Sequence, residues 1–275
     1  MAITIQNLSL LNLNQYKMKI IKATSTALIV LLLCCAGASL LQAQNSRFSY
    51  NKYSNGKGDS LNYRMLFPDS DTLRRYPLVI FLHGSGERGN NNEAQLQWGV
   101  SNFATDQAMA MHPAFVIAPQ CPEGQGWANI TRNNKSLQLS PTPAKTMELL
   151  IELIHKMTKD FKIDTNRIYI TGLSMGGFGT YDAIERYPHL FAAAVPVCGG
   201  GDVSKAASIA HIPMWIFHGA EDPAVDPVYS VDMMQALTKA GARPGFTQYP
   251  SVGHFSWIAA YSDPLMMGWL FSQHK

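Results

Sequence analysis

Residues 168–177 read Ile-Tyr-Ile-Thr-Gly-Leu-Ser-Met-Gly-Gly, and this stretch decides the fold. A short apolar run typical of a buried strand leads into Gly172, and a helical pattern follows. A sharp turn from strand to helix would force Ser174 into a strained backbone conformation, while small residues at 172 and 176 let neighbouring backbone approach. The Ser174 hydroxyl would then project above the sheet, beside the positive end of a helix dipole. This context predicts that Ser174 is a nucleophile rather than an idle serine in a Gly-rich turn.

Apolar runs and helical patterns alternate on both sides of this turn. Short runs bounded by Gly and Pro, typical of strands buried on both faces, occur at 78–82, 115–118, 168–170, 192–197, 214–217 and 246–249. Two earlier strands around a turn at 55–58 are expected at 48–54 and 61–67. Helices are expected at 143–161 (after Thr142 as its cap), 174–187, 227–240 and 264–273. The alternation predicts an α/β fold with one mostly parallel sheet flanked by helices.

A serine nucleophile needs a base, and the base needs an orienting acid. In a fold of this kind the chain order is serine, acid, histidine. His254 lies in a loop directly after the last predicted strand, where the base is required. His218 ends a strand and is expected to be structural, while His189 and His274 are expected at the surface and in the frayed terminus.

The acid should come from the loop after the penultimate strand. Residues 218–226 supply three candidates, Glu221, Asp222 and Asp226. We assign the acid to Asp222 and expect Asp226 simply to be solvated. Glu221 and Asp226 remain the alternatives.

An oxyanion hole needs two backbone N–H groups aimed at one point. One is expected from Met175, directly after the nucleophile. The other is expected from Ser85, in the loop that follows the strand at 78–82, with Gly86 as the alternative. His83 begins this loop, and we expect it to hold the loop in place.

Together these segments resemble the α/β-hydrolase superfamily. The match comprises four segments in order, spread across nearly all of the chain after residue 43: 83–89, 172–177, 218–222 and 253–254. The first of them, followed by Ala118-Pro119-Gln120-Cys121-Pro122 and Trp127, is similar to secreted esterases described as predicted peptidases or prolyl-oligopeptidase-like hydrolases. That group lies near feruloyl esterases and polyhydroxybutyrate depolymerases. The resemblance implies esterase activity on carboxylic esters, often linked to plant polysaccharides.

The surroundings of the site bear on the substrate. The connection between Cys198 and Met214 is short and Gly-rich, so we expect no large lid domain and an open cleft. An open cleft suits short acyl groups, or esters on a bulky polymer. Trp127, in the long loop 120–142, and Trp257 are candidates to wall the substrate pocket, with plain core packing as the alternative for each.

Three functions remain open at this point. We favour a serine carboxylesterase that acts through an acyl-enzyme on short-chain or aromatic esters, free or polymer-linked. A serine peptidase of the prolyl-oligopeptidase-like type would use the same residues. The complete Ser–Asp–His set argues against a non-catalytic binding relative. No cofactor and no metal are expected, because the histidines lack ligand spacing, paired cysteines are missing, and 84–89 lacks the Lys-Ser/Thr ending of a phosphate loop.

The first 43 residues have the pattern of a secretory signal peptide. Three lysines precede an apolar run at 27–33, and small residues follow it. Cleavage is expected after Ala43, with Ala38 as the alternative, and Met18 is a more typical start than Met1. The run is short for a membrane span, which leaves an uncleaved anchor as the second interpretation. We expect a secreted or periplasmic protein with one hydrolase domain at 44–275 and no stable membrane association.

The net charge limits which binding partners are expected, and the cysteine content limits which disulfides can form. Residues 1–43 hold three lysines and no acid, so 19 basic and 19 acidic residues remain in the rest of the chain. A formal charge of zero gives no reason to expect nucleic acid or an anionic membrane as a partner. Beyond the signal segment lie Cys121 and Cys198, for which export permits a disulfide. We favour two buried free thiols.

Overall fold

The computed structural model describes residues 42–68, 73–133 and 136–275. Nearly all of the predicted signal segment therefore lies outside the described residues. Residues 47–275 form one compact unit, and the unit at 1–46 is described only from Gln42, with a helical turn over 42–45. Among the described helices, none combines the length and the apolar character that a membrane span requires.

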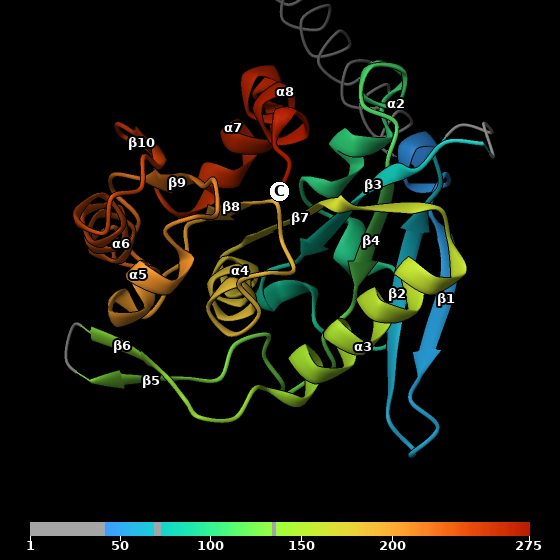
Figure 1. Ribbon diagram of the computed structural model, residues 1–275, viewed down its shortest axis with the longest axis horizontal. Helices are drawn as coiled ribbons and strands as arrows, with labels where there is room; N and C mark the ends of the chain where they lie inside the picture. The colour runs from blue at the N-terminus through green and yellow to red at the C-terminus, as the bar shows by residue number, and fades with distance from the viewer. Residues whose placement is uncertain (1–41, 69–72, 134–135) are drawn as a thin grey trace, which may run out of the picture. The chain divides into compact units, whose positions relative to one another are not determined.

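The unit at 47–275 is built on one eight-stranded sheet, in the order β1-β2-β4-β3-β7-β8-β9-β10 (Figure 1). Its strands are β1 (Ser49–Ser54), β2 (Ser60–Leu66), β3 (Tyr76–Leu82), β4 (Phe115–Pro119), β7 (Ile163–Leu173), β8 (Ala193–Val197), β9 (Trp215–Gly219) and β10 (Gly245–Tyr249). Each neighbouring pair from β4 to β10 is parallel, whereas β1 with β2 and β2 with β4 are antiparallel. All eight predicted strands are present, and the predicted mostly parallel sheet is confirmed.

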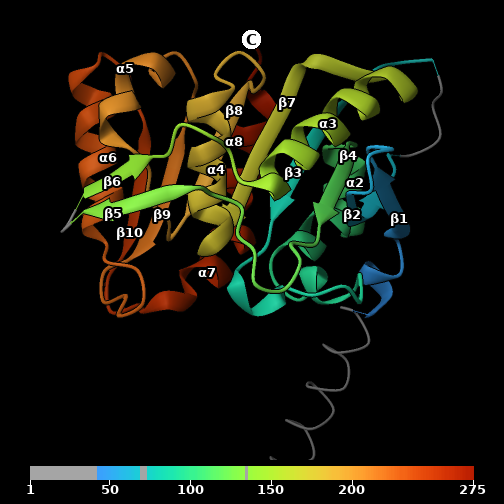
Figure 2. The same ribbon diagram turned by 90° about the horizontal axis from the view of Figure 1, so that it is seen from below.

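Helices cover both faces of this sheet (Figures 1 and 2). One face carries α3 (Lys145–Asp160), α4 (Met175–Arg186), α5 (Ala206–Ile209) and α6 (Val228–Lys239). The other carries α2 (Asp106–Met111), α7 (Trp257–Ser262), α8 (Pro264–Ser272) and the short 3-10 helices η2 (Ala94–Leu96) and η3 (Val100–Ala104). Each face buries its own apolar core, because the buried strands present side chains alternately to both sides.

Helix α3 has the apolar face that its sequence predicts, but it begins at a different residue. Its predicted apolar stripe is buried, with Met147 and Leu150 fully covered. The predicted cap was wrong. The N-cap is Ala144, which makes no side-chain cap hydrogen bond, and the helix begins at Lys145. Ala144 is still extended (φ −66°, ψ 148°), so Thr142 lies too far upstream to reach the first free N–H groups.

Two segments predicted as irregular have regular structure. The long loop 120–142 contains an antiparallel hairpin of β5 (Ile130–Asn133) and β6 (Ser136–Leu139). The connection after β8 carries η4 (Val203–Lys205) and α5 rather than plain coil. Cys121 and Cys198 are both buried and free, as we favoured.

Candidate active site

The carboxyl ends of the parallel strands bring the three predicted side chains to one edge of the sheet. Ser174 follows β7, Asp222 follows β9, and His254 opens the 3-10 helix η5 (His254–Ser256) after β10. His254 Nδ1 lies 2.7 Å from Asp222 Oδ2, and His254 Nε2 lies 2.9 Å from Ser174 Oγ. Since an ionised Asp222 can only accept, Nδ1 carries the proton and Nε2 is left to accept one from the Ser174 hydroxyl.

The turn that carries Ser174 is strained as its sequence predicts. Ser174 has φ 53° and ψ −115°, a conformation that L-residues rarely adopt. Its N–H donates to the Val197 carbonyl at 3.0 Å, which fixes the turn to β8. A Cβ on Gly176 would clash with the Leu82 carbonyl, and one on Gly172 would clash with the Gly176 carbonyl. Glycine at both positions is therefore required for the backbones to approach.

Asp222 is held by a set of donors that covers both of its oxygens. Oδ1 accepts from the backbone N–H groups of Ala224 (2.9 Å) and Val225 (3.0 Å), while Oδ2 accepts from His254. Burial raises the pKa of Asp222, but the hydrogen bond from His254 and those from the two amides outweigh it, so the pKa lies below its usual value. The carboxyl group is thus kept ionised beside the imidazole.

His218 has a place in the site that sequence reasoning missed. We expected a structural residue, and its Nδ1 accepts from the Ser230 hydroxyl at 2.7 Å. Its Nε2 donates to the Val225 carbonyl at 3.0 Å and also lies 3.3 Å from Asp222 Oδ2. Burial lowers the pKa of His218, so the ring stays neutral and acts as a second side-chain donor to the acid, after His254. No sequence signal marked this contact, because it depends on how the chain turns after β9.

The loop predicted to supply the oxyanion hole lies against the serine turn. Ser85 opens η1 (Ser85–Glu87) and Met175 opens α4, so neither N–H has a partner within its own helix. Gly84 packs on Leu173 so closely that a Cβ there would lie 2.9 Å from the leucine Cδ1. The two N–H groups thus belong to adjoining segments, and their role stays a prediction.

Two hydrogen bonds of the buried His83 ring hold this loop in place. Its Nδ1 donates to the Gly84 carbonyl at 2.6 Å, and its Nε2 accepts from the Cys121 N–H at 2.9 Å. Burial lowers the pKa of His83 to about 4, so the ring is neutral near pH 7 and can accept at Nε2. The loop is thereby fastened to the end of β4.

The family model described as phospholipase/carboxylesterase matches residues 69–263, more than half of the chain. The chain belongs to this family. Its membership confirms the resemblance to the α/β-hydrolase superfamily, and the sheet described above is the fold expected for it.

Individual relatives agree with the family. The chain is 26% identical over 178 residues to a bifunctional acetylxylan esterase/xylanase of Neocallimastix patriciarum, covering 64% of this chain and 23% of that protein. It is 27% identical over 177 residues to poly(3-hydroxyalkanoate) depolymerase C of Paucimonas lemoignei, covering 64% and 41%. It thus spans less than half the length of either relative. The crystal structure of a thermostable esterase superposes with a TM-score of 0.79 at 39% identity, covering 85% of this chain and 64% of that one.

The two tryptophans proposed as pocket walls differ in their surroundings. Trp127 is fully buried, donates to the His83 carbonyl at 3.1 Å and packs on the His83 ring. These contacts favour core packing for Trp127, which offers no surface to a substrate. Trp257 is 5% exposed and meets the His254 ring edge to face, with centroids 5.0 Å apart. Trp257 therefore supports the His254 ring from behind and offers little surface to a substrate pocket.

Among the described residues, one group of side chains has ligand atoms close enough for a metal ion. Cys198, Asp222 and His254 place one such atom each within 4.8 Å of one another. Two of the three already form the hydrogen bond described above. Burial raises the pKa of the Cys198 thiol to about 12, which disfavours the thiolate that a metal would need. The chemistry of the group therefore fits a hydrogen-bonded acid and base better than a metal centre.

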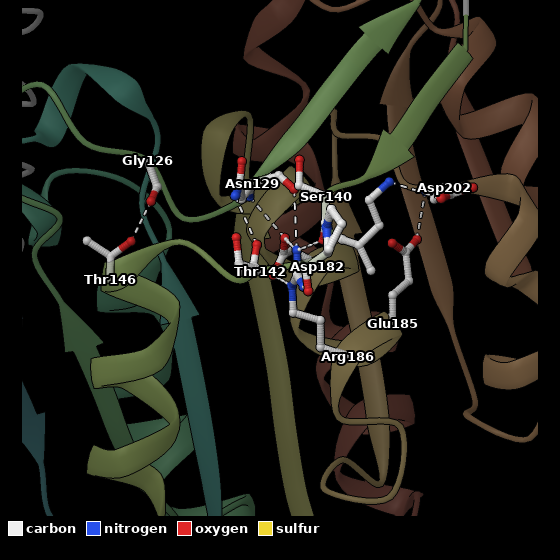
Figure 3. Close-up of polar contacts among 11 residues, drawn as sticks. Gly126, Asn129, Ser140, Thr142, Thr146, Asp182, Glu185, Arg186 and Asp202 are labelled. Carbon is white, nitrogen blue, oxygen red and sulfur yellow. Dashed lines mark hydrogen bonds and ion pairs between the residues drawn. The ribbon is translucent and has the colours of Figure 1, made fainter.

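The helix behind Ser174 carries a buried ion pair whose two residues also bond to the β5–β6 hairpin segment (Figure 3). Arg186 Nε lies 2.8 Å from Asp182 Oδ1, with side chains 9% and 0% exposed. Asp182 Oδ2 also accepts from the Asn129 N–H at 3.0 Å, and Arg186 donates to the Ser140 carbonyl at 2.8 Å. Both ends of the hairpin segment are thus bonded to the same turn of α4.

A second contact fixes the C-terminal end of β6. Glu185 Oε1 accepts from the Asp202 N–H at 2.8 Å, and Asp202 Oδ2 accepts from the Leu139 N–H at 2.9 Å (Figure 3). Burial raises the pKa of Glu185 well above its usual value. The hairpin is therefore joined to α4 both directly and through the segment before η4.

Proposed function

We propose that this protein is a secreted serine carboxylesterase that acts through an acyl-enzyme on short-chain or aromatic esters, including esters carried by polysaccharides. The observation that carries the proposal is the chain of two hydrogen bonds from Asp222 through His254 to Ser174, at a strained turn in a carboxylesterase-family fold. The acetylxylan esterase and the polyhydroxyalkanoate depolymerase among the relatives support polymer-linked esters. The signal-peptide pattern at 1–43 supports secretion.

The geometry supports a two-step reaction. Ser174 Oγ attacks the ester carbonyl carbon while its proton passes to His254 Nε2, and Asp222 stabilises the imidazolium that forms. The N–H groups of Met175 and Ser85 would receive the negative charge that develops on the carbonyl oxygen. His254 then gives its proton to the leaving alcohol, and the acyl group stays on Ser174. A water molecule, deprotonated by His254, attacks the acyl-enzyme and releases the acid.

Replacing the nucleophile tests this function. Ser174→Ala should lower turnover of acetate esters by a factor on the order of 10⁶ while the protein stays folded. A fluorophosphonate probe should label the wild-type protein at Ser174 alone, as read by peptide mass spectrometry. Ser208→Ala, at an exposed serine of α5, is the matched control and should behave like wild type.

Three outcomes would contradict the proposal. An active Ser174→Ala variant, or labelling at another residue, would remove Ser174 from the reaction. Cleavage of aminoacyl-prolyl anilides in preference to esters would make the protein a peptidase with the same residues. Retention of the protein inside the cell, with residues 1–43 uncleaved, would contradict secretion.

A further inference from the structure

Three aromatic rings lie together beside the base. Trp257 contacts His254 and packs on Phe255, with ring centroids 4.7 Å apart. Trp98, which precedes η3 and is more than 150 residues away in sequence, reaches both: its ring centroid is 6.0 Å from that of Phe255 and 6.2 Å from that of Trp257. These rings come from two segments that are distant in sequence, one after β10 and one after η2.

Part of this cluster faces solvent, although it is apolar. Trp257 is 5% exposed and supports the others, whereas Phe255 is 57% exposed and Ile258, one turn further along, is 54% exposed. Trp98 is half-buried. Exposed apolar surface of this kind beside a reactive site is favourably covered by a ligand, because each Å² removed from water contributes about 25 cal/mol.

The direction of proton transfer in the reaction determines which half of the ester lies beside this aromatic cluster. The leaving alcohol must take its proton from His254 Nε2, so the alcohol half of the ester lies on the His254 side of Ser174. Phe255 is the next residue after His254, and Trp257 supports both rings. On its other side the cluster reaches the oxyanion loop: burial raises the pKa of Glu87 in η1, and the nearby Trp98 side chain partly offsets that rise.

We propose that Trp98, Phe255 and Ile258 form the alcohol subsite, and that it selects esters whose alcohol carries a six-membered ring with an apolar face close to the ester oxygen. The inference rests on the proposed esterase function and specifies its substrate. An aromatic platform binds such a ring through its apolar face, with no need for a charge on the substrate. Both an aryl-methyl alcohol and a pyranose of a polysaccharide have this chemistry.

Esters with one acyl group and different alcohols test the subsite. Benzyl acetate and a mono-acetylated methyl xyloside carry rings, and ethyl acetate does not, while all three release an alkyl alcohol. For Phe255→Ala we expect KM to rise about 5- to 10-fold on the ring substrates, from the usual strength of aromatic stacking, and less than about 2-fold on ethyl acetate. The value of kcat should stay within about 2-fold on all three. Leu265→Ala, at a 72% exposed residue of α8 outside the cluster, is the matched control and should change neither.

The two ring substrates distinguish the sources of the alcohol. A loss confined to the xyloside identifies a sugar as the natural alcohol, a loss confined to benzyl acetate identifies an aryl alcohol, and either supports the subsite. An equal change on ethyl acetate, or no change on any substrate, overturns it. Trp98→Ala is a second variant for the same series, with circular dichroism to check its fold. If wild-type protein showed no Ser174-dependent turnover of any ester, the proposed function itself would fail, and the subsite with it.

Discussion

At the residue scale, the site is built from strain and from complete hydrogen bonding of one acid. Ser174 is held at positive φ by glycines that admit close backbone contacts, so the hydroxyl has one place to point. Asp222 has both oxygens occupied, which leaves His254 one orientation that satisfies it. The pre-set geometry lowers the reorganisation that the reaction needs.

Asp222→Asn should lower kcat by roughly 10⁴, as the same change does in a well-studied protease. The physical reason can be followed in the structure. The side-chain oxygen of Asn would stay with the N–H groups of Ala224 and Val225, so its NH₂ would face His254 Nδ1. That arrangement favours the imidazole with its proton on Nε2, which can no longer accept from Ser174. Ester hydrolysis at saturating substrate measures the loss.

The neighbouring acids supply the controls for this experiment. Glu221 and Asp226 are both exposed, and Asp226 only accepts from the nearby Val228 N–H at 3.0 Å. Glu221→Gln and Asp226→Asn should therefore remain within about 2-fold of wild type, as is usual for surface changes. A loss of tenfold or less in Asp222→Asn, together with a large loss in Asp226→Asn, would move the acid to Asp226.

That Ser174, Asp222 and His254 would lie together could be predicted, because their motif, their order and their positions after strands can be recognised in the sequence. Partners of those residues could not. His218 was expected to be structural, but its second contact, to Asp222, depends on how the chain turns between them. The Asx-type turn at Asp222-Pro223 was a usable sign that Asp222 would accept from the following amides. The burial of Trp127 could not be predicted from the sequence, because it follows from contacts with His83 and Gly179 on other elements.

At the element scale, α4 and the β5–β6 hairpin depend on the Asp182–Arg186 pair. Arg186→Met should lower the free energy of unfolding by about 3–5 kcal/mol, because Asp182 would keep a buried charge without its partner. Lys156→Met in α3 removes the same i,i+4 geometry at the surface, where the side chains are 55% and 44% exposed, and should cost less than about 1 kcal/mol. Urea unfolding of the two variants gives the comparison. Equal losses would show that burial of the Asp182 pair contributes nothing.

The hairpin also shows why some elements escaped prediction. Along β5 and β6 only Leu137 is buried, and apart from the short polar–apolar alternation Ser-Leu-Gln-Leu at 136–139 the sequence has no apolar run to mark a strand. Its structure is supplied by distant contacts, with Asp182, Arg186 and Asp202 bonding its backbone. The first part of β7 was missed for a similar reason, since Asp164–Arg167 is polar although it extends a buried strand. Central strands were predictable because burial on both faces demands apolar runs.

At the scale of the whole molecule, the arrangement of elements around the site limits the acyl group. Between β8 and β9, residues 198–214 are all described and hold only η4 and α5, so no large helical lid lies in this segment. Each methylene buried in a deep apolar groove would contribute about 0.8 kcal/mol, close to a fourfold gain in kcat/KM per carbon. A site without a covering lid cannot collect that gain beyond the first few carbons.

We therefore expect kcat/KM on 4-nitrophenyl esters to be greatest for acetate to butyrate and to fall for chains longer than about eight carbons, because a longer chain loses conformational freedom on binding without burying further apolar surface. Methyl ferulate tests whether a compact aromatic acid is accepted as well. The acyl series varies the half of the ester that remains on Ser174, so Phe255→Ala should leave its shape unchanged even where it weakens binding of a ring alcohol. Steady-state rates over acetate, butyrate, octanoate and palmitate esters give the profile. If kcat/KM instead kept rising to palmitate, an apolar groove would have to form around the acyl chain, and the protein would act as a lipase.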